Sequence, residues 1–183
     1  MDKGLAADIK RGLKISYDYI ISFFIFLALA TPIISFTSEN AANYIRIASF
    51  VVFLLLTCIV YVDMRNYGLK ESRPQYEINP KPYKGLLYGF IGAIPLIIVQ
   101  LIIISIKLPE GTEILHRRFY QAFAGPFYWL VCLLGNKAGH YVIAFLSIII
   151  ISFIGYYAGH KGIYILETIR IKLGIKPVKR NNN

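Results

Sequence analysis

The chain has 183 residues, of which 56% are hydrophobic and only 16% are charged, and its mean hydropathy is +0.55. Soluble domains carry about 25% charged residues, and here the deficit falls in long apolar runs that are typical of membrane spans. The formal net charge of +10 comes from basic residues that flank these runs. Because no basic motif is interleaved with aromatic residues, we exclude nucleic acid as a partner and expect a bilayer with an anionic inner leaflet.

Four intervals without charged residues mark the expected spans. Each is close to the about 20 residues that a helix needs to cross a bilayer. The sequence therefore predicts an all-α fold, a single polytopic transmembrane helical bundle over residues 1–183, with a basic cytoplasmic tail at 160–183. The spans are expected at about 16–36, 44–63, 85–107 and 140–159.

Two segments are expected at the cytoplasmic surface: one before the first span and one between the second and third spans. Before the first span, apolar residues recur every four positions beside basic ones, which predicts a short amphipathic helix lying on the membrane. The segment DMRNYGLKESRPQYEINPKPYKG contains three prolines and predicts an extended connection. Its acidic residues predict a solvated, salt-bridging surface, with acid or ligand chemistry as the alternative. The apolar residues are Leu5, Ile9 and Leu13, and the acidic ones are Asp63, Glu71 and Glu77.

The stretch FYQAFAGPFYWLVCLLG, residues 119–135, is long enough to be a fifth crossing. Four crossings place 15 of the 20 Lys and Arg residues inside and five outside, whereas five crossings divide them ten and ten. The first division obeys the positive-inside rule and the second defines no orientation. Pro126 removes a backbone donor after Gly125, and the neighbouring aromatic residues favour the headgroup level. We therefore expect a re-entrant or interfacial segment on the outer side, broken at Gly125 and Pro126.

Small residues four positions apart occur in two of the expected spans. They let helix backbones approach closely in lipid, and four crossings place both motifs at the same depth. The sequence thus predicts a contact between the third span and the last one. The glycines concerned are Gly85, Gly89 and Gly92 in the third span and Gly155 and Gly159 in the last.

Gln100 is the one large polar residue deep in a span. We expect an interhelical hydrogen bond to Ser147 or Ser152, with contact to a bound ligand as the alternative. The spans hold no Asp, Glu, Lys or Arg away from their ends, which disfavours ion-coupled or proton-coupled transport by this chain alone.

No recognisable catalytic, cofactor or metal motif occurs in the sequence. Cys58 and Cys132 lack metal-ligand spacing and are expected to be packing residues. We accordingly predict no cofactor and no metal, and a non-enzymatic structural or accessory subunit with a membrane-protein partner or as a homo-oligomer. A transporter or channel subunit is one alternative. An enzyme acting on lipid or lipid-linked substrates is another, for which the outer polar residues His116, Arg117, Arg118 and His140 are the candidates.

The layout resembles small four-span membrane proteins of unassigned function from low-GC Gram-positive bacteria. Three elements carry the resemblance: the inner loop leading into NPKPYKGLLYGFIGAIP, the outer stretch FAGPFYWL, and the last span ending in GYYAGHKG. The resemblance implies a plasma-membrane protein and adds no activity.

The charge distribution generates a prediction of topology. A reporter that is active only in the cytoplasm should be active when fused after Asn183 and inactive when fused near Thr112, because four crossings return the tail to the cytoplasm. Reporter activity measures the location of each site. Activity of a reporter specific for the outside at Asn183 would contradict the four-span topology.

Overall fold

The computed structural model describes residues 4–36, 40–73, 81–106 and 111–162. Within these ranges the chain is helical and contains no strand, which confirms the all-α prediction. In chain order the elements are α1 (Leu5–Phe36), α2 (Ala41–Glu71), α3 (Lys84–Ser105), α4 (Glu113–Phe123), the 3-10 turn η2 (Gly125–Phe127), α5 (Tyr128–Leu134), α6 (Ala138–Ala144) and α7 (Leu146–His160).

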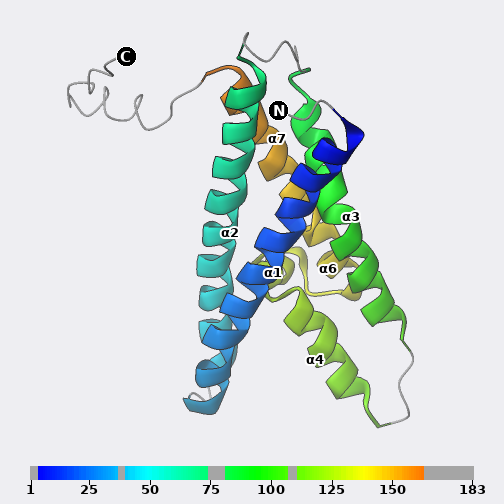
Figure 1. The fold of residues 1–183 in the computed structure, drawn as a ribbon. Coiled ribbons are helices and arrows are strands. Elements are labelled where there is room, and N and C mark those ends of the chain that lie inside the picture. Colours follow the sequence, from blue (N-terminus) through cyan, green and yellow to red (C-terminus); the bar gives the residue numbers. More distant parts are fainter. Residues whose placement is uncertain (1–3, 37–39, 74–80, 107–110, 163–183) are drawn as a thin grey trace, which may run out of the picture.

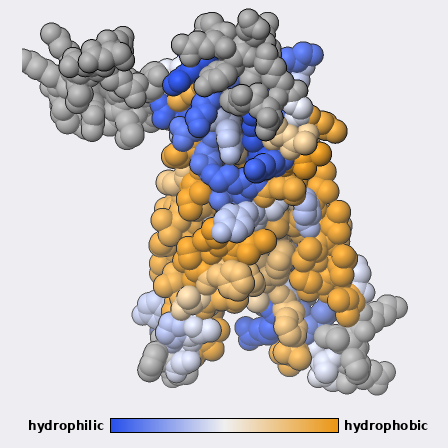
Figure 2. Space-filling view, viewed as in Figure 1, coloured by the Kyte–Doolittle hydropathy of each residue, from blue (hydrophilic) through white to orange (hydrophobic). Residues whose placement is uncertain are grey.

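Four stretches are long and apolar enough to cross a membrane, in agreement with a multi-pass membrane protein. They are α1, α2, α3 and the combined α6 and α7, which together cover Ala138–His160. We call the end where α1 and α3 begin and α2 and α7 end the upper end, as it is drawn in Figure 1. Hydrophobic residues cover the side of the bundle below this end, and hydrophilic ones gather at it (Figure 2).

The helices extend further at the upper end than the sequence predicted. The expected surface helix is the first part of α1, which is continuous from Leu5, and the start of the expected loop is the last part of α2, which ends at Glu71. Both corrections have one cause: charged residues of these segments pair with each other inside the bundle. Glu77 and the tail from residue 163 lie outside the described residues.

Aromatic side chains fill the middle of the bundle. Tyr19 from α1, Phe127 from η2 and Phe145 between α6 and α7 are fully buried. Their ring centroids lie 5.1–5.5 Å apart, within the range of stacked and edge-to-face contacts. The segment after α4 therefore packs in the core of the bundle.

Glycines bring the helices together, although one pair has a different partner from the one expected. A Cβ at Gly89 would lie 2.8 Å from the Cα of Ile149, so α3 does pack on α7. Gly155 and Gly159, however, face α2: a Cβ at Gly155 would lie 2.8 Å from the carbonyl oxygen of Tyr61. The expected contact between two glycine motifs is corrected, since α7 presents its glycines to α2.

The remaining predicted packing glycines also lie at helix contacts. A Cβ at Gly85 would lie 2.5 Å from that of Tyr156 on α7, and one at Gly92 would lie 2.7 Å from the carbonyl oxygen of Gly12 on α1. The hydroxyl of Ser16 donates to the carbonyl of Gly92 at 2.7 Å, so this close approach also carries a hydrogen bond.

A matched pair of glycine substitutions tests the contact between α2 and α7. Gly155→Ala should lower the melting temperature, because overlap with the α2 backbone costs about 1–3 kcal/mol. Gly139→Ala is the control, since nothing lies within 4 Å of its Cβ position and alanine favours a helix by up to about 1 kcal/mol. Thermal unfolding of the purified protein in detergent measures both. Equal or higher stability of Gly155→Ala would contradict the close contact.

Candidate functional site

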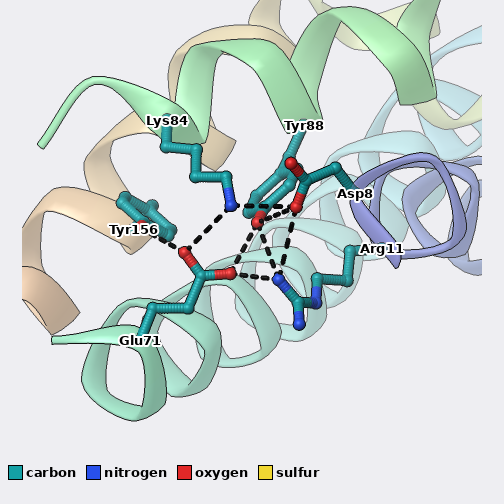
Figure 3. Close-up of polar contacts among 6 residues, drawn as sticks. All are labelled: Asp8, Arg11, Glu71, Lys84, Tyr88 and Tyr156. Atoms are coloured by element: carbon teal, nitrogen blue, oxygen red, sulfur yellow. Dashed lines mark hydrogen bonds and ion pairs between the residues drawn. The ribbon is translucent and has the colours of Figure 1, made fainter. Parts of the chain in front are cut away.

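Six polar residues from four helices meet inside the upper end of the bundle (Figure 3). We call this group the upper polar cluster. Its members are Asp8 and Arg11 from α1, Glu71 from α2, Lys84 and Tyr88 from α3, and Tyr156 from α7.

Glu71 lies at the centre of the cluster, and its side chain is fully buried. One carboxylate oxygen accepts a hydrogen bond from the Tyr156 hydroxyl at 2.7 Å and lies 3.4 Å from the Lys84 ammonium. The other accepts from the Tyr88 hydroxyl at 2.6 Å and from the guanidinium of Arg11. Both oxygens of this buried carboxylate are thus satisfied by charged or hydroxyl donors from three other helices, as a buried charge requires.

Asp8 closes the cluster from the side of α1. Its carboxylate lies 2.8 Å from the Lys84 ammonium and 3.4 Å from the Arg11 guanidinium, and the Tyr88 hydroxyl is within 3.0 Å. Tyr88 has one hydroxyl proton, which Asp8 and Glu71 share as alternative acceptors, while Arg11 donates to the Tyr88 oxygen at 3.0 Å. Two carboxylates and two cations balance, so the cluster carries no net charge.

Helical spacing and a glycine explain how the sequence builds this cluster. Asp8 and Arg11 lie three positions apart, and Lys84 and Tyr88 lie four apart, so each pair occupies one face of its helix. A Cβ at Gly68 would overlap the Tyr156 carbonyl, so a glycine at this position lets α2 and α7 approach one turn before Glu71. The close approach of the α2 and α7 backbones therefore brings the Tyr156 hydroxyl within reach of the Glu71 carboxylate.

The expected solvated surface is wrong at Glu71, which is buried rather than exposed to water. The missed signal is the series Met64, Gly68 and Glu71, whose spacing places all three on the buried face of α2. Asp63, the other described acidic residue of the expected surface, forms an ion pair with Lys14.

The break at Gly125 and Pro126 is buried, and side chains of other helices satisfy its backbone. The Ser49 hydroxyl of α2 donates to the Gly125 carbonyl at 2.7 Å and accepts from the amide of Trp129 at 3.0 Å. Tyr19 of α1 donates to the carbonyl of Phe123. Non-helical backbone inside an apolar bundle requires such partners, because lipid supplies none.

Gln100 is fully buried, and its amide contacts the backbone of α4 rather than the serines of the last span. Its Nε2 donates to the Tyr120 carbonyl at 3.2 Å, whereas Ser147 and Ser152 donate to carbonyls of their own turns. The Gln100 Oε1 atom is buried and has no hydrogen-bond partner in the described part of the chain. The expectation of ligand contact stays a prediction.

The outer polar residues named for an enzyme do not assemble into a metal centre. His116 hydrogen-bonds the Ile103 carbonyl at 2.6 Å, and His140 accepts from the amide of Lys137 at 3.3 Å. Among the described residues no group of three or more His, Cys, Asp or Glu side chains could hold a metal ion. Cys58 is exposed and Cys132 half-buried, so the expected role in buried packing is wrong for Cys58.

Comparison with protein families, curated proteins and solved structures found no match to this chain. The functional argument therefore depends on the geometry of the residues themselves.

Removal of the central carboxylate tests the structural importance of the cluster. Glu71→Gln should destabilise the fold by about 3–5 kcal/mol, because it leaves two half-buried cations, Arg11 and Lys84, with one carboxylate. Lys70→Gln is the matched control, since Lys70 is an exposed neighbour in the same helix turn. Thermal unfolding in detergent should show a lower melting temperature for Glu71→Gln alone. Unchanged stability of this variant would mean that the cluster contributes little to helix association.

Proposed function

We propose that the chain is a non-enzymatic structural or accessory subunit of a membrane-protein complex. One observation carries the proposal: the charged and hydroxyl groups of the upper polar cluster bind one another and tie four helices together. A neutral cluster with satisfied carboxylates has no group left to activate a substrate. Its contribution is to fix the relative positions of α1, α2, α3 and α7.

Contacts at mid-depth support the same function. The hydrogen bonds of Ser49 and Tyr19 attach the segment after α4 to α1 and α2, and the aromatic core fills the space between them. A polar group that loses its partner in hydrocarbon costs several kcal/mol, so these contacts favour one arrangement of the helices. A bundle with a single arrangement suits a component that presents its outer helix faces to other membrane proteins.

We infer further that the protein lies in the plasma membrane with both termini in the cytoplasm. The unequal distribution of Lys and Arg residues supports this orientation, in which the upper end is cytoplasmic. Exposed basic side chains at this end, including Lys10, Lys70 and Lys81, would then face the anionic inner leaflet.

A subunit of a transporter or channel is the second candidate, and the environment of Gln100 favours it. The unpartnered Gln100 oxygen lies in the bundle interior, and the same side chain bonds the helix that precedes the backbone break. A small polar solute bound there would supply the missing donor. In this function α4 and the break would control access to the bound solute.

Purification from native membranes distinguishes the two candidates. After mild extraction, we expect a tagged chain to co-purify with a membrane partner in fixed stoichiometry, and reciprocal tagging of that partner to recover the chain. Deletion of the chain should lower the amount of the assembled partner complex. The variant Glu71→Gln should weaken this association, with Lys70→Gln as the control.

Two results would contradict the subunit proposal. One is a chain that purifies alone while every partner complex assembles normally in its absence. The other is solute uptake by liposomes that contain only this chain, reduced by Gln100→Leu, which would establish transport instead.

A further inference from the structure

A second group of ionisable residues lies between α1 and α2, about two helical turns further along α1 than Arg11. We call it the lateral acidic pair: Asp18 on α1 and Asp63 on α2, with Lys14 one turn before Asp18. Figure 2 shows hydrophilic residues continuing from the upper end part of the way down the face of the bundle that is drawn. No function proposed above uses these three residues.

Both carboxylates face each other and the same cation. Asp18 is only 5% exposed, and its side chain lies within hydrogen-bonding reach of Asp63. Lys14 forms an ion pair with Asp63 and also interacts electrostatically with Asp18. The side chains of Lys14 and Asp63 are 41% and 22% exposed, so Asp18 is the buried member of the group.

The charges of this group do not balance, in contrast to those of the upper polar cluster. Two carboxylates share one ammonium group, and the buried Oδ2 atom of Asp18 accepts no hydrogen bond from the described residues. A carboxylate oxygen that is buried without a donor is costly, and two ionised carboxylates in contact repel each other. Binding of one positive charge removes both costs.

We propose that Asp18 and Asp63 form a binding site for one proton, which the two carboxylates share, while Lys14 neutralises the remaining negative charge. The bound proton makes one residue a carboxylic acid whose O–H donates to a carboxylate oxygen of the other. Its release returns one proton to water and leaves two ionised carboxylates. The site would then hold α1 against α2 more strongly with the proton bound.

Three other groups in the described part of the chain are engaged elsewhere. On α2, Tyr67 flanks Lys14 and also lies under the guanidinium of Arg11. On α3, Lys84 is already paired with Asp8 and Glu71. The Ser22 hydroxyl donates to the backbone carbonyl of Asp18 and not to its carboxylate. A proton is thus the simplest partner that fits two carboxylates in contact.

Infrared spectroscopy of the full chain in lipid nanodiscs tests the proposal. At mildly acidic pH the spectrum should contain the carbonyl band of one protonated carboxylic acid, and this band should be lost as the pH is raised. Asp18→Asn and Asp63→Asn should each abolish it, because either change leaves one carboxylate paired with Lys14. Glu113→Gln, which removes an exposed carboxylate of α4, should retain it.

The wild-type titration tests the shared proton without any variant, so it stands even where a substitution prevents assembly. Absence of the band at mildly acidic pH, or its persistence in both Asn variants, would overturn the proposal. The titration is repeated with choline in place of sodium and potassium. A band that appears only without alkali ions would assign the site to an alkali cation and would overturn the proton assignment. These outcomes are independent of whether the chain has a protein partner.

Discussion

The structure depends on one constraint: polar groups inside a bundle whose sides are apolar must find their partners within the protein. Glu71 shows the constraint most clearly, because its buried carboxylate is bonded by donors from α1, α3 and α7. Those donors reach it only if the helices approach closely, which the glycines at positions 68 and 85 allow. The buried polar groups can therefore form their hydrogen bonds only because the helices pack closely.

The same constraint explains the segment between α4 and α5. The turn at Gly125 and Pro126 interrupts helical hydrogen bonding in the core of the bundle, and Ser49 and Tyr19 bond its freed backbone groups. Each partner belongs to a helix that is also tied into the bundle elsewhere. A backbone break can occupy this position because α1 and α2 are already held there by their contacts with the aromatic core.

Sequence reasoning predicted the number and approximate positions of the long helices, because apolar runs of this length rarely form anything other than membrane-spanning helices. It misplaced the upper ends of α1 and α2, because it took charged residues to mark the limits of the spans. That rule holds when a charge is solvated, and here Asp8, Arg11 and Glu71 are paired instead. The glycines were recognisable as packing residues, but their partners were not, because the rotation of α7 about its axis has no signature in one sequence. Ser49 was unpredictable for a similar reason, since a serine in an apolar run does not reveal which backbone it bonds.

The two polar groups that join α1 to α2, the upper polar cluster and the lateral acidic pair, differ in their balance of charges. In the upper polar cluster, carboxylates and cations are equal in number, and α3 and α7 contribute donors. Between Asp18 and Asp63, carboxylates exceed cations, and one buried oxygen lacks a donor. In a complete network each charge stabilises its neighbour, whereas an incomplete one is stabilised by the uptake of a positive charge. With the proposed proton site, α1 and α2 are joined by a fully paired cluster at the upper end and by a titratable pair of carboxylates below it, so that pH would alter the contact between the two helices at the second site.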